Sequence, residues 1–115
     1  MSDQSFIETG KAAYYRIDRF TVPAAGYDEF MSRVRQTHAV LKSQPGFIRD
    51  HIVERPLPAG FSEIVTIAEW QTEDHVASAR LAVRTSQLEA GFDPQEMFGR
   101  LEIDAAIASY APSSR

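Results

Sequence analysis

The chain has 115 residues, a formal net charge of −4 and no cysteine. This length is typical of one domain, and the missing thiols exclude disulfides, thiolate zinc sites and cysteine nucleophiles. The acidic balance and the scattered basic residues argue against nucleic-acid binding, which requires clustered lysine and arginine. No apolar stretch approaches the ~20 residues of a membrane span, and the start of the chain does not resemble a signal peptide. We therefore expect a cytoplasmic protein that binds no membrane, with one domain over residues 12–110 and flexible termini at 1–11 and 111–115.

The first half of the chain predicts a strand, a helix and a second strand, over residues 14–22, 24–44 and 47–54. The first strand alternates aromatic and branched side chains with charged ones and is ended by Pro23. The helix repeats apolar side chains at spacings of three and four, and Pro45 and Gly46 end it. The second strand leads into a loop at 55–60 that contains proline and glycine, which is typical of an open hairpin.

The second half predicts a strand, a long helix, a short helix and a last strand, with the strands over residues 63–71 and 101–110. Thr72 suits the N-cap of the long helix, which runs to about residue 88. Asp93, Pro94 and Glu96 place an N-cap, a proline at the first helical position and a capping-box glutamate in order. This is the most specific local signal in the chain.

This order is the α+β, ferredoxin-like β-α-β-β-α-β arrangement, with a four-stranded antiparallel sheet and the helices on one face. The other face of the sheet would carry Ile17, Val65 and Ile67, which are too apolar for contact with water. An exposed apolar face of this kind usually marks an association surface. Two such sheets packed face to face would form an eight-stranded barrel, so we expect a homodimer.

Four segments carry a resemblance to a known family: IDRFTVPA, QPGF, TIAEWQTEDH and IDAAIASY. In this order they resemble the antibiotic biosynthesis monooxygenase (ABM) domain, a dimeric α+β barrel, over roughly residues 12–110. The superfamily contains quinol and anthrone-type monooxygenases that need no metal or flavin, haem-degrading enzymes and many members of unknown activity. In the polyketide-oxidising and haem-degrading relatives, a tryptophan at the end of the third strand lines a pocket between sheet and helices. Trp70 matches that position.

Haem degradation is disfavoured by two departures from the haem-degrading relatives. These relatives have an asparagine in the first strand, whereas the matching residue here is Asp18. Their iron ligand is a histidine on the second helix, but no histidine follows His75 in this chain. The three histidines also lack the spacing of a metal site, so we expect no metal and no other cofactor.

Asp18 and His38 are the candidate catalytic residues. Asp18 shares a strand face with apolar residues, where burial would raise its pKa towards the range of a general base. The alternative is a strand-end charge that reaches solvent or pairs with Arg16 or Arg49. His38 lies on the apolar face of the first helix, where it either packs in the core or hydrogen-bonds to a ligand oxygen.

The resemblance implies a cofactor-independent monooxygenase that oxidises a small hydroxylated aromatic or quinol-type molecule with dioxygen. The substrate itself is then the reductant: it loses a proton, and the anion passes an electron to dioxygen. Asp18 or His38 would take the proton, and Arg16 would stabilise the anion. The candidate substrate-binding residues are Trp70, Arg16, Phe30 and Val34.

A second hypothesis keeps the fold and the dimer but has no catalysis. In this hypothesis the protein is a ligand-binding or stress-response module, Trp70 packs in the core, and Asp18 is an ion-pair partner. The sequence leaves both hypotheses open. They differ in whether a pocket beside Trp70 is lined by both Asp18 and His38.

Overall fold

The sheet and helices of the computed structural model, which describes residues 14–113, follow the expected β-α-β-β-α-β order. The elements are β2 (Tyr14–Pro23), α2 (Tyr27–Lys42), β3 (Phe47–Pro56), β4 (Phe61–Trp70), α3 (Glu73–Glu89), α4 (Pro94–Leu101) and β5 (Asp104–Tyr110). All pairings are antiparallel, and the strand order β3-β4-β2-β5 places the first and third strands in the middle. The α+β ferredoxin-like prediction is therefore confirmed.

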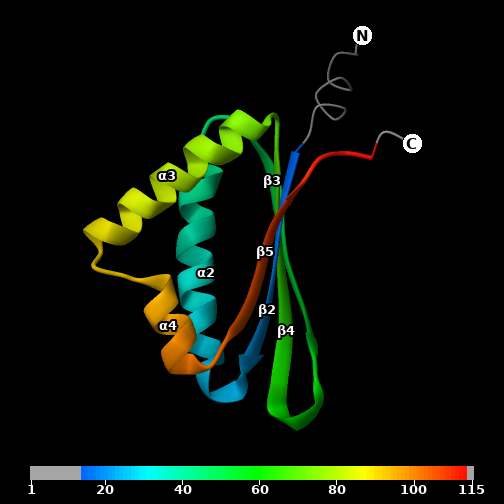
Figure 1. Ribbon diagram of the computed structural model, residues 1–115, viewed down its shortest axis with the longest axis vertical. Coiled ribbons are helices and arrows are strands. Elements are labelled where there is room, and N and C mark those ends of the chain that lie inside the picture. The colour runs from blue at the N-terminus through cyan, green and yellow to red at the C-terminus, as the bar shows by residue number, and fades with distance from the viewer. Residues whose placement is uncertain (1–13, 114–115) are drawn as a thin grey trace.

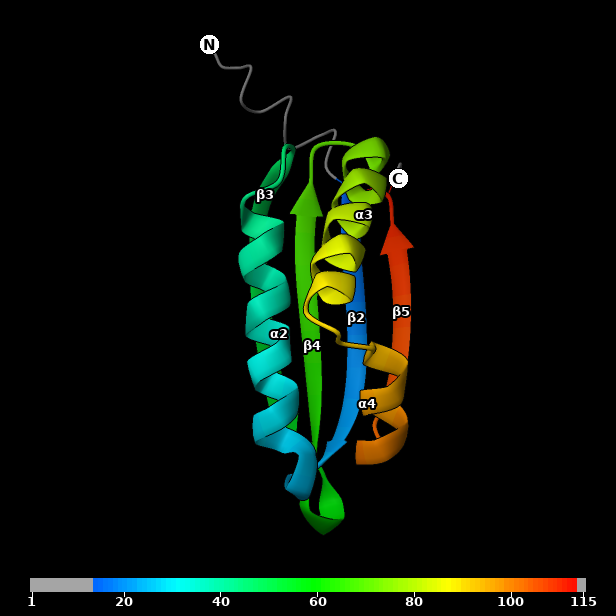
Figure 2. The ribbon, with the colours of Figure 1, turned by 90° about the vertical axis from the view of Figure 1, so that its left-hand side faces the viewer.

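The helices all lie on one face of the sheet (Figures 1 and 2). Helix α2 runs along the side of β3 and β4, whereas α4 lies beside the lower part of β5 in Figure 2. Helix α3 starts close to the sheet and slants away from it towards its C-terminal end (Figure 1).

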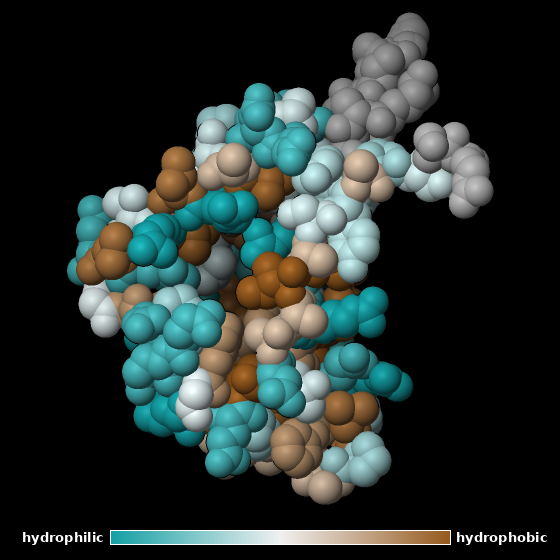
Figure 3. Space-filling model, viewed as in Figure 1, coloured by the Kyte–Doolittle hydropathy of each residue, from teal (hydrophilic) through white to brown (hydrophobic). Residues whose placement is uncertain are grey.

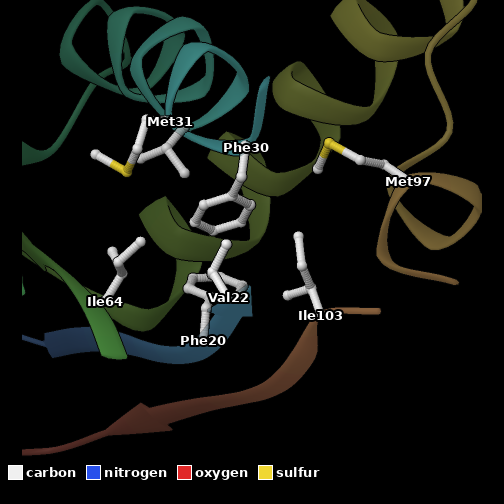
Figure 4. Packing of buried hydrophobic residues seen from close by; sticks show 8 residues of the cluster. Phe20, Val22, Phe30, Met31, Ile64, Met97 and Ile103 are labelled. Carbon is white, nitrogen blue, oxygen red and sulfur yellow. The ribbon is translucent and has the colours of Figure 1, made fainter. Parts of the chain in front are cut away.

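The main core lies between the sheet and helices α2 and α4. Figure 4 shows Phe30 of α2 pointing towards Phe20 and Val22 of β2, and the rings of Phe20 and Phe30 are 4.8 Å apart. The other buried members of this cluster are Met31, Val34, Ile64, Met97 and Ile103. Burial of these side chains is the main force that holds the helices on this face of the sheet.

A second, smaller core cluster surrounds Trp70, which is 1% exposed. Its indole packs edge-on against Phe47, with ring centroids 5.4 Å apart. Ala68 of β4 and Val76 and Ala79 of α3 complete the buried part of the cluster. Trp70 therefore faces the helices, as strand alternation predicts.

The outer face of the sheet is not covered by any element among the residues that the structure describes (Figures 1 and 2). Ile17 and Ile67 lie opposite each other in the register of β2 and β4, and Val65 is opposite Arg19. All three apolar side chains are half-buried, and Val53 of β3 on the same face is 50% exposed. The predicted apolar outer face is therefore present.

The predicted start of the last strand at residue 101 is wrong. Helix α4 continues to Leu101, and Glu102 ends it in the left-handed conformation with a φ of 59°. Ile103 then turns into the core, and β5 begins at Asp104. Alternation alone did not separate the last helical turn from the strand, because both contain alternating apolar and charged residues.

A β-bulge interrupts the start of β3. Phe47 lies opposite Trp70 and Arg49 lies opposite the next residue, Glu69, so that Ile48 is an extra residue. The bulge turns Phe47 towards the helices, whereas Arg49 lies on the outer face, with its Nη1 atom 2.8 Å from Oε1 of Glu69. Simple alternation, which places Phe47 and Arg49 on one face, is wrong at this point.

Most of the residues expected to form flexible termini are not among those that the structure describes. Residues 1–11 and 114–115 lie outside the described residues, and 111–113 are exposed without regular secondary structure. No helix within residues 14–113 combines the length and the apolar character that are needed to cross a membrane.

Candidate functional site

A cavity of about 330 Å³ lies between the sheet and α3. Trp70, Ala68, Arg16 and Asp18 contribute its sheet side. Helix α3 contributes Val76, Ala79, Arg80, Leu81, Val83, Arg84 and Gln87. This volume is at the lower end of the range of small-molecule sites, and the cavity combines an aromatic wall with several charged groups.

A second cavity of about 280 Å³ adjoins the first one. Phe30, Val34 and His38 of α2 line it, together with apolar residues of α4 and β5. Five residues line both cavities: Arg16, Asp18, Thr37, Val83 and Gln87. Figure 3 shows the surface hollowed between the helices and β5, with apolar side chains inside. Arg16 and Asp18 therefore lie where the two cavities meet.

Asp18 forms an ion pair with Arg16 at this junction. The Nε atom of Arg16 donates to Oδ1 of Asp18 over 2.9 Å, and the two side chains are only 22% and 18% exposed. Burial raises the pKa of Asp18, against the opposing effects of Arg16, His38 and a hydrogen bond from the Ala108 backbone. The alternative in which Asp18 pairs with Arg16 is thus observed, whereas Arg49 pairs with Glu69.

His38 is buried on α2 and contacts a carboxylate of β3. Its Nδ1 atom lies 2.7 Å from Oδ2 of Asp50. Since a carboxylate accepts, this contact assigns the proton to Nδ1 and leaves Nε2 of a neutral ring as an acceptor. An oriented imidazole of this kind is able to take a proton from a bound molecule.

The structure brings the six predicted site residues into two groups. Arg16, Asp18 and Trp70 line the first cavity, and Phe30, Val34 and His38 line the second together with the shared Arg16 and Asp18. Trp70 does not form one wall with Phe30 and Val34, because it packs in a different core cluster. Asp18 and His38 come together in the second cavity, but His38 does not reach the cavity beside Trp70.

The sequence-based prediction did not include three residues. Asp50 lies on the helix-facing side of β3, opposite Ala68, but alternation gives only its face and not its contact with His38 of α2. Arg80 and Arg84 line the first cavity from α3, although both residues are exposed, and their spacing of four residues was the available signal. Among residues 14–113, no group of three or more histidine, aspartate or glutamate side chains is arranged to hold a metal ion.

Comparison of the fold with solved structures finds the same architecture in other proteins. SnoaB, a cofactor-independent oxygenase from Streptomyces nogalater, is 21% identical, with a TM-score of 0.56 over 90% of this chain and 96% of SnoaB. A dimeric ferredoxin-like protein from an uncultured marine organism is 8% identical, with a TM-score of 0.66 over 90% of this chain and 97% of that one. At these identities the likeness concerns the fold alone.

Sequence comparison identifies the family. The chain shows no significant match to a curated protein. The family model described as antibiotic biosynthesis monooxygenase matches residues 13–81, which is more than half of the chain. The match includes β2 with Asp18, α2 with His38, and β4 with Trp70. The chain therefore belongs to the antibiotic biosynthesis monooxygenase family.

Proposed function

We propose that the protein is a cofactor-independent monooxygenase that oxidises a small hydroxylated aromatic or quinol-type molecule with dioxygen. The observation that carries this proposal is the position of Asp18 where the two cavities meet, with burial raising its pKa and Arg16 beside it. Family membership and the fold shared with SnoaB support the reaction class.

Each group at this junction has a task in the proposed reaction. Trp70 and the apolar side chains of α3 hold the flat ring and keep water from the reacting carbon. Asp18 removes a proton from the ring system, and its raised pKa makes it a stronger base than an ordinary aspartate. Arg16, on the same strand face, stabilises the anion that forms.

The electrons for the reaction come from the substrate. In an anthrone, the carbanion passes one electron to dioxygen, and the two radicals combine to a hydroperoxide on the same carbon. The hydroperoxide then loses its O–O bond and the second hydrogen of that carbon, which yields a quinone carbonyl and one water. One oxygen atom enters the product and the other leaves as water, so no external reductant is required.

His38 and Asp50 serve as a second proton-transfer pair in this proposal. His38 lines the cavity that Asp18 also lines, and Asp50 holds its Nδ1 atom. The free Nε2 atom is suited to take up the proton that Asp18 collects and so to return Asp18 to its ionised state. His38 thus completes the catalytic pair, with Phe30 and Val34 as apolar walls of its cavity.

The protein works as a homodimer in this proposal. Ile17, Val65, Ile67 and Val53 form an apolar outer sheet face that no other described element covers. Two such faces packed together would remove this apolar surface from water. The dimeric ferredoxin-like protein of similar fold supports the assignment.

Two observations favour the alternative of a ligand-binding module without catalysis. Asp18 is already paired with Arg16, and Trp70 is almost completely buried. In that case the cavities bind an aromatic molecule but do not activate it.

An oxygen electrode separates the two functions. The protein, treated with a chelator and freed of flavin, is mixed with a panel of anthrones and quinols, and product mass is followed in ¹⁸O₂. A monooxygenase consumes oxygen and gives a product that contains one labelled atom. If no member of the panel gives protein-dependent oxygen uptake, the monooxygenase proposal is contradicted and the binding module remains.

A further inference from the structure

We propose that the hydroxyl of Thr66 is a proton relay, which carries to His38 the proton that Asp18 takes from the substrate. This inference rests on the proposed function and deepens it, because it names the group that returns Asp18 to its ionised state. In the proposed reaction the proton has to cross from strand β2 to the imidazole of α2, and Thr66 belongs to the strand between them, β4.

Strand β4 separates Asp18 from the carboxylate that holds His38. The strand order is β3-β4-β2-β5, with Asp18 on β2 and Asp50 on β3. Neighbouring strands lie about 4.8 Å apart, so β2 and β3 are separated by roughly 10 Å. Proton transfer requires heavy atoms within about 2.6–3.2 Å, or a bridge between them. A group on β4 that exchanges protons is therefore placed to form the bridge.

Thr66 is the residue of β4 that lies at this position. It is directly opposite Asp18 in the register of β2 and β4, and opposite side chains on one face have Cβ atoms about 4.5–5.5 Å apart. Thr66, Asp18 and His38 all line the second cavity. Burial raises the pKa of Asp18 and the charge of His38 opposes this effect, so the two groups interact across the cavity. The neighbours of Thr66 on this face of β4, Ile64 and Ala68, have no exchangeable side-chain proton.

The hydroxyl of Thr66 is buried and has no hydrogen-bond partner. Only 6% of the residue is exposed. Among residues 14–113, no side-chain hydrogen bond includes this hydroxyl. A buried polar group without a partner costs free energy, and valine would fill the same space without this cost. Packing therefore does not explain the hydroxyl, whereas a relay requires a group that both donates and accepts.

The relay moves one proton along three groups. The hydroxyl oxygen of Thr66 accepts the proton of the Asp18 carboxylic acid, while its own O–H bond breaks and that proton passes to Nε2 of His38. Asp18 is then a carboxylate and His38 an imidazolium. The peroxide anion that forms from the ring anion and dioxygen takes the proton from His38 and becomes the hydroperoxide. All three side chains are then as they began.

Thr66→Val tests the relay, because it removes the hydroxyl and keeps the shape of the side chain. The probe is the anthrone of the panel, such as 1,8-dihydroxy-9-anthrone, that the parent protein oxidises fastest. We expect kcat to fall by about tenfold or more and KM to change little. The melting temperature should stay equal or rise, since the lost hydroxyl has no partner. Thr66→Ala, a second variant without the hydroxyl, should show the same loss of kcat.

Two further variants serve as controls. Thr66→Ser keeps the hydroxyl and should retain most of the turnover. Thr21→Val makes the same chemical change as Thr66→Val in a half-buried threonine of β2 that lines neither cavity, so turnover should stay that of the parent. Circular dichroism verifies that each variant is folded.

A small base distinguishes a relay from a structural role. The surface is hollowed between the helices and β5 (Figure 3), so imidazole from the buffer has access to the cavity. Added imidazole should raise the turnover of Thr66→Val several-fold, because it takes the proton from Asp18 in place of the hydroxyl. The turnover of the parent protein should not respond to imidazole.

Three results would overturn the inference: parental kcat in Thr66→Val, an equal loss in Thr66→Ser, or a loss in Thr66→Val that imidazole does not restore. Oxygen uptake by the parent protein separates this failure from failure of the monooxygenase proposal. If the parent takes up no oxygen with any member of the panel, both proposals fall. If the parent takes up oxygen and Thr66→Val does so equally fast, the relay alone is contradicted.

Discussion

Nδ1 of His38 and Oδ2 of Asp50 lie 2.7 Å apart and connect helix α2 to strand β3 beneath it. Both side chains are largely buried, with 9% and 15% of their surface exposed. The contact fixes the plane of the imidazole and directs its second nitrogen away from Asp50, because the two ring nitrogens point in opposite directions. A residue that sequence reasoning overlooked thus orients one that it identified.

Asp50→Asn should lower oxygenase activity without removing the imidazole. Asparagine keeps the shape of the side chain but no longer stabilises the protonated ring of His38. We expect a loss of about tenfold, which is less than the 10²–10⁴ typical of losing a general base itself. A purely structural role of Asp50 would change the stability but leave the pH profile of the remaining activity unchanged, whereas a positioning role shifts that profile.

Asp18→Asn tests the proposed base directly. Turnover of the quinol should fall by a factor of about 10²–10⁴. Asp104→Asn is the control and should have little effect, because Asp104 is an exposed aspartate of β5 that lines neither cavity. In the parent protein, activity should rise with pH through the pKa of Asp18, which burial holds above the ordinary value of 3.8. Equal turnover in the Asp18→Asn variant and the parent would exclude Asp18 as the base.

The same substitution should alter how stability depends on pH. Because the pKa of Asp18 is raised by folding, the folded protein binds this proton more tightly than the unfolded chain does. The free energy of unfolding therefore falls as pH rises from 3.8 through the pKa of the folded state. Asp18→Asn removes this dependence, so the variant should gain stability relative to the parent as pH rises through that window. Urea unfolding of both proteins at a series of pH values measures the difference. If the variant instead gained stability relative to the parent as the pH was lowered through this window, the raised pKa of Asp18 would be contradicted.

Trp70→Ala should destabilise the fold by about 3–5 kcal/mol, because it removes a fully buried indole and leaves a cavity beside Phe47. Trp70→Phe should lose less, since an aromatic ring remains to pack edge-on against Phe47. Chemical denaturation, followed by circular dichroism because the variants contain no tryptophan, gives both values. A loss in Trp70→Ala of well under 1 kcal/mol would show that the indole is not part of the core.

Ile67→Glu should convert the proposed homodimer to a monomer. Ile67 lies at the centre of the outer sheet face, opposite Ile17 and beside Val65, so a charge there would be buried without a partner in the dimer. Leu88→Glu, the same kind of change at an exposed apolar residue of α3, is the control and should leave assembly unchanged. Sedimentation equilibrium at micromolar concentration distinguishes the states, and a monomeric parent protein would refute the dimer.

Strand alternation correctly predicted which face of the sheet the side chains of the candidate site occupy where the strands are regular. It assigned Arg16, Asp18 and Trp70 to the helix-facing side, and the structure has all three there. Alternation assigns a face, however, and not a depth or a neighbour. The division of the interior into two cavities depends on the tilt of α3, which no local pattern encodes.

The three residues that the sequence-based prediction did not include were missed for physical reasons. Asp50 has the face that alternation with Arg49 and His51 gives it, but its contact with His38 joins two elements, and no local pattern encodes that pairing. Arg80 and Arg84 are exposed residues of α3 at the edge of the first cavity, so their sequence pattern is that of ordinary surface charges. Local sequence patterns are least informative where a cavity replaces a packed core.

The extra residue Ile48 also determines how β3 responds to changes in chain length. Without it, Phe47 could stay against Trp70 only if Arg49 moved off the outer face, where Glu69 would lose its cation. Glu69 is 8% exposed and also accepts a hydrogen bond from Tyr15, so an unpaired carboxylate there would be costly. In a library of insertions and deletions, variants with a changed length in the 58–60 hairpin turn should therefore fold. Variants that lack residue 48 should not fold, whereas substitutions at 48, which preserve the chain length, should be accepted.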